Sequence, residues 1–182
     1  AFGDGSVVVV APGTYQEEAP IDITKANVSI IGQSLRSCIV HPTAATEESV
    51  LFRVNTGTFI QNITFMGMKA SGAAGNSVDA ALPVNQGWNV AFYPNASIFK
   101  SPYIQNCTNF SDSQIDNSNI NVITPAGGSA GDLTSAPTGG GLLVDGSVVN
   151  SNSPLRSMVC DSYTHVGLNG PGILVTNNGY VQ

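Results

Sequence analysis

One stretch of the sequence occurs twice, and this repeat restricts the fold more than any other feature. "FIQNITF" begins at Phe59, and "YIQNCTNF" begins at Tyr103, 44 residues later. Both stretches run aromatic, Ile, Gln, Asn, a variable residue and Thr, and both close on Phe. Self-similarity of this kind is typical of solenoid proteins, in which each structural repeat stacks on the next. The repeat therefore predicts that the two stretches occupy equivalent places in a stacked fold.

Two pairs of residues define the predicted stack. With a repeat of roughly 22 residues, the two stretches would lie one above the other with one repeat between them. Ile60 and Ile104 should then stack inward. Asn62 and Asn106 suit a bend between strands, because Asn tolerates the left-handed backbone region. Their amides could form hydrogen bonds along the stack, as in asparagine ladders.

The rest of the chain also favours strands. Short runs rich in Val, Ile, Phe, Tyr and Thr, such as 27–34, 50–57 and 141–149, alternate with turn residues. The chain holds 20 Gly and 10 Pro, and its best helical candidate, 76–84, is interrupted by Pro83. The sequence therefore predicts an all-β protein.

Two segments of low charge interrupt the predicted strands. Residues 67–87 and 117–141 are rich in Gly, Ala and Ser, and strands resume directly after each of them. We expect both to be long loops that project from one scaffold. The organisation predicted from the sequence is one domain over residues 1–182, as a portion of a longer chain.

Composition narrows the possible partners. Hydrophobic residues make up 42% of the chain, enough for a core, while charged residues make up 10% and the net charge is −6. Proteins that bind nucleic acids need clustered Lys and Arg to neutralise the phosphates, so binding to nucleic acid is not expected. No apolar run reaches the ~18 residues of a membrane span, so membrane insertion is not expected either. Neutral glycans remain possible partners.

Few residues have the type and spacing of a catalytic or metal-binding site. His41 and His165 lie far apart in the sequence, and Cys38, Cys107 and Cys160 do not have metal-site spacing, so we expect no metal, no cofactor and three buried free thiols. Asp161, Ser162 and His165 do not predict a catalytic triad, because alternate residues of a strand face opposite sides.

Three aromatic residues are the candidates for glycan binding. They are Trp88, Tyr93 and Tyr103. Aromatic faces pack against the C–H surface of sugar rings, which is the reason for choosing these residues. The alternative is that all three fill the core or the bases of loops.

The first half of the chain resembles pectin-lyase-like proteins. The resemblance rests on "VVVVAPGTYQEEAPIDITKANVSIIGQS" (7–34) and "TGTFIQNITF" (56–65). It implies a right-handed single-stranded parallel β-helix, here with long inserted loops. The catalytic motifs of the methylesterases and pectate lyases of this group are absent, because Asp112, Asp116 and Asp145 lack the flanking residues of those motifs and a nearby Arg. We therefore expect no catalytic residue in this sequence.

The second half resembles structural proteins of marine tailed bacteriophages, notably those that infect cyanobacteria. The resemblance rests on "SPYIQNCTNFSD", "TGGGLLVDGSVVNSNSPLRSMVCDSYTHV" and "GPGILVTNNGYVQ" over roughly 100–182. It implies a tail fibre, tailspike or adjacent virion component, assembled in the bacterial cytoplasm with other virion proteins. By the same analogy we expect a homotrimer that contributes to recognition of a host surface glycan. The alternatives are a polysaccharide-degrading β-helix enzyme and a baseplate or collar scaffold without host contact.

Overall fold

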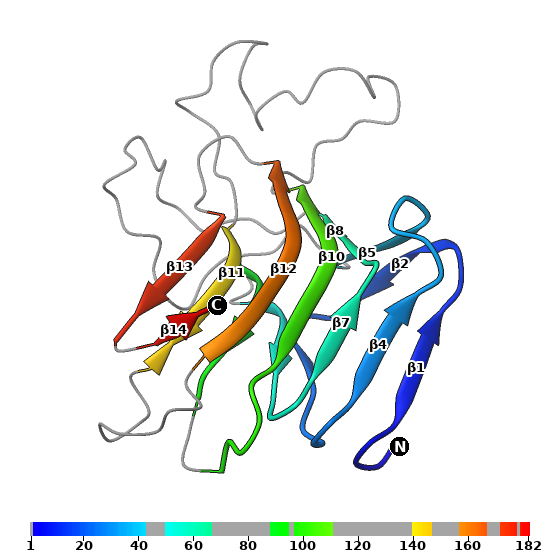
Figure 1. The fold of residues 1–182 in the computed structure, drawn as a ribbon. Helices are drawn as coiled ribbons and strands as arrows, with labels where there is room; N and C mark the ends of the chain where they lie inside the picture. The colour runs from blue at the N-terminus through cyan, green and yellow to red at the C-terminus, as the bar shows by residue number, and fades with distance from the viewer. Residues whose placement is uncertain are drawn as a thin grey trace, which may run out of the picture.

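A computed structural model describes residues 2–42, 50–66, 88–94, 97–110, 140–146, 157–166, 172–177 and 179–182. The described residues form strands joined by turns, which confirms the predicted all-β class (Figure 1). The strands are β1 (Val7–Val10), β2 (Gly13–Glu17), β3 (Ile21–Asp22), β4 (Ser29–Gly32), β5 (Cys38–Pro42), β6 (Val50–Val54), β7 (Phe59–Gln61), β8 (Thr64–Met66), β9 (Trp88–Phe92), β10 (Tyr103–Phe110), β11 (Gly140–Asp145), β12 (Ser157–Val166), β13 (Ile173–Thr176) and β14 (Tyr180–Val181).

The strands pair in a regular sequence order. Strand β1 pairs with β4 and β4 with β7, while β2 pairs with β5 and β5 with β8. Strand β3 pairs with β6 and β6 with β9 in the same way. Each of these strands thus lies beside the strand three positions later, and every pair in the described part of the chain is parallel. Neighbouring strands in space are therefore equivalent members of successive strand triplets.

Strand β10 joins two sets of paired strands, β1-β4-β7 and β2-β5-β8, into one sheet. Its first part, Tyr103–Gln105, pairs with β7, and its last part, Thr108–Phe110, pairs with β8. Strand β12 pairs along most of β10, and β14 pairs with β12, which completes a curled nine-stranded sheet (Figure 1). The second sheet has five strands in the order β13-β11-β9-β6-β3.

The core contains side chains from both sheets. Ile30, Ile60 and Ile104 lie opposite one another on β4, β7 and β10, and each is at most 7% exposed. Phe52 of β6 packs edge-on against Phe65 of β8, with ring centroids 5.8 Å apart. Because each strand places a like residue over the last one, the apolar side chains form continuous columns.

The two repeated stretches are direct neighbours, so the prediction of an intervening repeat is wrong. Ile60 and Ile104 face each other across the β7–β10 pair, with hydrogen bonding from Tyr103 N to Thr58 O at 2.8 Å. The 44 positions from Phe59 to the residue before Tyr103 contain the triplet β7, β8 and β9 together with residues 67–87. An inserted segment, and not a second repeat, accounts for the spacing.

Asparagines occupy the bend between β7 and β8 and the equivalent point of β10. Asn62 and Asn106 have φ angles of 56° and 48°. Asn106 Nδ2 donates to Asn62 Oδ1 at 2.6 Å, and Asn62 Nδ2 donates to the Gly32 carbonyl at 3.2 Å. The left-handed backbone turns the chain at the same level in successive strands, and the amides connect those levels.

The predicted loops fall mostly outside the described residues. The segment 67–87 lies wholly outside them, and so do residues 117–139 of the second loop. Gly140 and Gly141, at the end of the predicted loop, begin β11. A side chain at position 141 would collide with the Gly172 carbonyl, which explains a glycine in this strand.

The three cysteines are free thiols, two of which are buried. Cys38 and Cys107 lie in the core, whereas Cys160 is only partly buried, so the prediction of three buried thiols is wrong for Cys160. Burial raises the pKa of the Cys107 thiol to about 12. At neutral pH this thiol is protonated and packs as a small apolar group.

Candidate functional site

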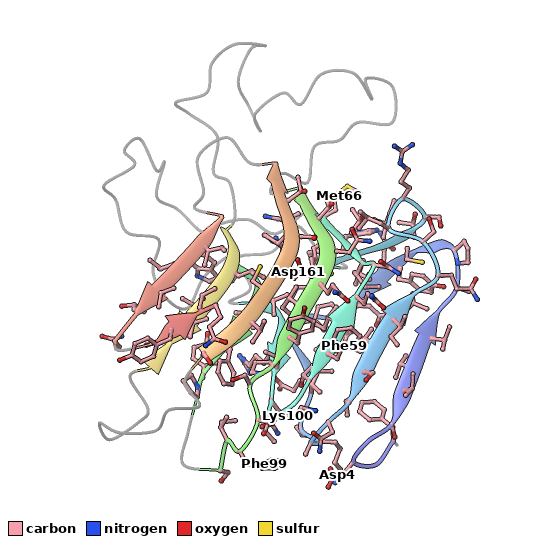
Figure 2. All side chains as sticks on the ribbon, viewed as in Figure 1. Asp4, Phe59, Met66, Phe99, Lys100 and Asp161 are labelled. Atoms are coloured by element: carbon pink, nitrogen blue, oxygen red, sulfur yellow. The ribbon has the colours of Figure 1, made fainter. Side chains whose placement is uncertain are left out.

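The outward side of β4, β7, β10 and β12 presents two aligned rows of side chains. Ile30, Ile60 and Ile104 are buried, so the residues on either side of each one face away from the core. The first row is Ser29, Phe59, Tyr103 and Val159, and the second row is Ile31, Gln61, Gln105 and Asp161. We call the surface formed by these two rows the outer face; Figure 2 labels Phe59 and Asp161 on it.

The first row contains an aromatic pair. The rings of Phe59 and Tyr103 are stacked, with centroids 5.5 Å apart and planes 12° from parallel. Both residues are partly exposed. Their neighbours in the row, Ser29 and Val159, have short side chains, so each ring has one face against its partner and the other beside a small residue.

The second row is a chain of hydrogen bonds that ends on a carboxylate. Gln61 Nε2 donates to Gln105 Oε1 at 2.8 Å, and Gln105 Nε2 donates to Asp161 Oδ2 at 3.0 Å. The Ser162 hydroxyl donates to Asp161 Oδ1 at 3.0 Å. The Tyr103 hydroxyl lies 3.4 Å from Asp161 Oδ2 and connects the aromatic row to the polar row.

These contacts set the charge on the outer face. Hydrogen bonds from Gln105, then from Ser162 and Tyr103, lower the pKa of Asp161. Partial burial raises the pKa of the Tyr103 phenol, and the nearby charge of Asp161 adds to that rise. At neutral pH the face therefore presents an ionised carboxylate beside a protonated phenol.

A hollow of about 650 Å³ adjoins the aromatic pair. The residues that line it come from the first row and from the turns that precede β4, β7 and β10. They are Asn27, Ser29, Gly57, Thr58, Phe59, Phe99, Lys100, Ser101, Tyr103 and Val159. The volume is within the range of sites for small ligands, about 300–1,000 Å³. Among these residues Lys100 carries the only charge.

The rim of the hollow is held by one buried hydroxyl. Thr56 Oγ1 accepts hydrogen bonds from the backbone N–H groups of Phe99 and Lys100 at 3.1 and 3.0 Å, and it donates to the Lys100 carbonyl at 3.1 Å. Gly57, with φ 65°, donates from its N–H to the same carbonyl at 2.8 Å. A side chain at position 57 would collide with Asn27 Oδ1, so this position favours glycine in two ways.

The three aromatic candidates from the sequence do not come together. Tyr103 lies on the outer face, whereas Trp88 and Tyr93 belong to the five-stranded sheet region. Trp88 is fully buried among Val50, Ala91 and Leu143, so its ring faces are covered by protein. Tyr93 is partly buried against the same cluster, and burial is the main cause of its raised pKa.

Four side chains that form the stacking and hydrogen bonds of the outer face were not among the candidates from the sequence: Phe59, Gln61, Gln105 and Asp161. The signal for the first three was present, because both repeated stretches place an aromatic residue and Gln on either side of the inward Ile. Asp161 gave no such signal, because β12 shares the position but not the residues of the repeat.

The described residues contain no group of three His, Cys, Asp or Glu side chains placed to hold a metal ion. Within the same residues, no helix has the length and apolar character needed to cross a membrane. Comparisons with models of protein families, with curated proteins and with solved structures found no match to this chain.

Proposed function

We propose that the strand triplets are the coils of a right-handed single-stranded parallel β-helix. Three observations support this proposal: the parallel pairing of each early strand with the strand three positions later, the inward column of Ile30, Ile60 and Ile104, and the asparagine corners. The resemblance of residues 7–34 and 56–65 to pectin-lyase-like proteins supports the same architecture and its handedness.

We further propose that the outer face binds a glycan. The observation that carries this proposal is the Phe59–Tyr103 pair beside a row of amides and a carboxylate, at the edge of a hollow large enough for a sugar ring. A pyranose has an apolar C–H face, which packs on an aromatic ring, and hydroxyls around its edge, which pair with amide and carboxylate groups. The two rows supply both kinds of partner side by side.

The proposed setting is a bacteriophage tail. The resemblance of residues 100–182 to tail proteins of marine phages supports a fibre, spike or adjacent component of the virion, assembled in the bacterial cytoplasm. Apolar side chains are exposed at both ends of the strand stack, for example Val9 at 62% and Ile173 at 42%. This exposure favours contacts with further coils or with neighbouring virion proteins, and a homotrimer is the arrangement we propose.

A glycoside hydrolase of the β-helix class would need two cooperating acids in one groove. Among the described residues the outer face carries one carboxylate, Asp161, and its hydrogen bonds hold it in the ionised form. The arrangement therefore favours binding over hydrolysis of a glycosidic bond.

Retention on envelope polysaccharide from marine cyanobacteria tests the glycan-binding proposal. The wild-type protein should be retained without releasing new reducing ends. Tyr103→Ala and Phe59→Ala should each weaken binding roughly two- to tenfold, because an aromatic contact of this kind is worth about 0.5–1.5 kcal/mol. Phe2→Ala is the matched control. Phe2 is an aromatic residue with 45% exposure, and it lies near Val8, Val10 and Ile30 and not on the outer face.

Each result points to one function. New reducing ends would make the protein an enzyme, with acids outside the outer face. No retention of the wild-type protein would reject glycan binding and favour the baseplate or collar scaffold. Equal losses in the Phe2 and Tyr103 variants would show that the outer face is not the binding surface.

A further inference from the structure

The direction of the hydrogen bonds in the second row fixes what it can offer to a ligand. Gln61 and Gln105 each use one N–H of the side-chain amide within the row, so each has a second N–H left for a ligand. The Gln61 carbonyl oxygen has no side-chain donor in the row. An ionised carboxylate has about four acceptor positions, and contacts from Gln105, Ser162 and Tyr103 occupy up to three at Asp161.

This pattern matches hydroxyl groups better than other ligand groups. A sugar hydroxyl both donates and accepts, so one hydroxyl could donate to Asp161 while its neighbour accepts from Gln105. The carboxylate can only accept, and its hydrogen bonds to hydroxyls are of the stronger, charge-assisted kind. An acidic sugar in the same place would bring a second negative charge against Asp161.

The surroundings do not offset that repulsion. Among the described residues that line the hollow, Lys100 alone is charged. It lies in the turn before β10, on the far side of Phe59 in the first row from Asp161 (Figure 2). The chain as a whole has a net charge of −6. A carboxylate or sulfate placed along the second row would therefore lack a cationic partner among the described residues of that row.

We propose that Asp161 is the specificity-determining residue of the outer face, which selects neutral sugars with adjacent free hydroxyls and rejects acidic sugars. This inference rests on the proposed glycan-binding function and names the ligand class of that site. Asp161 acts by direct contact with the sugar, and Gln105 and Ser162 position its carboxylate.

A matched set of ligands and variants tests the inference. The ligands are neutral gluco-, manno- and galacto-hexasaccharides, and the same hexasaccharides after oxidation of C6 to the uronate. The variants are Asp161→Asn, which keeps an acceptor for Gln105 but removes the charge, and Asp22→Asn as the control. Asp22 is an exposed carboxylate on the other sheet, 3.2 Å from Arg53, so this substitution changes the net charge equally without touching the outer face.

We expect the wild-type protein and Asp22→Asn to bind at least one neutral hexasaccharide roughly tenfold or more tightly than its oxidised form. Asp161→Asn should bind the neutral form several-fold more weakly and lose most of the preference over the oxidised form. Circular dichroism of each variant checks that the fold is retained.

The outcomes separate this inference from the function on which it rests. Binding of neutral and oxidised forms with equal affinity, or an unchanged preference in Asp161→Asn, would overturn the role of Asp161 and leave glycan binding in place. Tighter binding of the oxidised forms by the wild-type protein would overturn the proposed ligand class. Failure of the wild-type protein to bind any of these ligands or the envelope polysaccharide would overturn both proposals.

Discussion

The asparagine corner shows how a single residue type sets the geometry of the stack. Asn62 and Asn106 adopt left-handed backbone angles and are joined by their side-chain amides. We predict that Asn106→Ala lowers the free energy of unfolding by about 1.5–3.5 kcal/mol. The left-handed backbone costs an ordinary residue about 1–2 kcal/mol, and a hydrogen bond contributes about 0.5–1.5 kcal/mol. Urea denaturation followed by circular dichroism measures the difference.

Asn106→Gly separates the two contributions. Glycine accepts the left-handed backbone without strain but has no amide, so it should cost less than alanine at this position. Equal losses of stability in the two variants would show that backbone strain does not contribute. Unchanged stability in both variants would show that the Asn62–Asn106 hydrogen bond does not stabilise the fold.

The left-handed residue on the next strand shows why the sequence predicted only part of this column of corner residues. Ser162 lies opposite Asn106 and has a φ angle of 54°, yet it is not an asparagine. The repeated motif made Asn62 and Asn106 predictable as a corner. Ser162 and the neighbouring Asp161 could not be found in that way, because the position is set by strand pairing and not by residue identity.

Strand β9 shows a limit of pattern reasoning at the level of one element. Alternation assumes a strand with one solvent-exposed face, but all five residues of β9 are buried. Val90 and Phe92 belong to the main core cluster, while Trp88 and Ala91 belong to a second buried cluster. The local sequence around an aromatic residue in such a strand does not show whether the ring is covered by protein or open to a ligand.

The burial of Trp88 gives a prediction for this element. Trp88→Ala should lower the free energy of unfolding by about 3–5 kcal/mol, as expected when a large buried aromatic side chain is removed. Trp88→Phe, which leaves most of the volume filled, should cost less. Thermal or urea unfolding measures both. A Trp88→Ala variant with unchanged stability and lost retention on polysaccharide would instead assign Trp88 to a binding surface.

At the scale of the molecule, the strand class was predictable and the order of stacking was not. Val-, Ile- and Thr-rich runs bounded by Gly and Pro predict strands from local chemistry alone. The distance between equivalent strands depends on segments such as 67–87, whose length carries no information about pairing. The sequence therefore predicted that Ile60 and Ile104 are equivalent but placed one repeat too many between them.

Position along the stack should decide the cost of an identical substitution. Ile60 has strands on both sides, with Ile30 and Ile104 opposite it, and has no exposed surface. Among the described residues, Ile173 pairs with Leu142 alone and is 42% exposed, because β13 is the last described strand of its sheet. We predict that Ile60→Ala lowers the free energy of unfolding by about 2–5 kcal/mol, and that Ile173→Ala costs less than about 1 kcal/mol.

Urea denaturation at several protein concentrations measures both losses with the same change of side chain. In the proposed β-helix each coil contacts only its neighbours, so a strand with one neighbour contributes less to stability than a strand with two. An Ile173→Ala loss as large as that of Ile60→Ala would contradict the prediction for the isolated chain. If that loss also depended on protein concentration, β13 would be covered by another molecule in solution, as the proposed tail assembly requires.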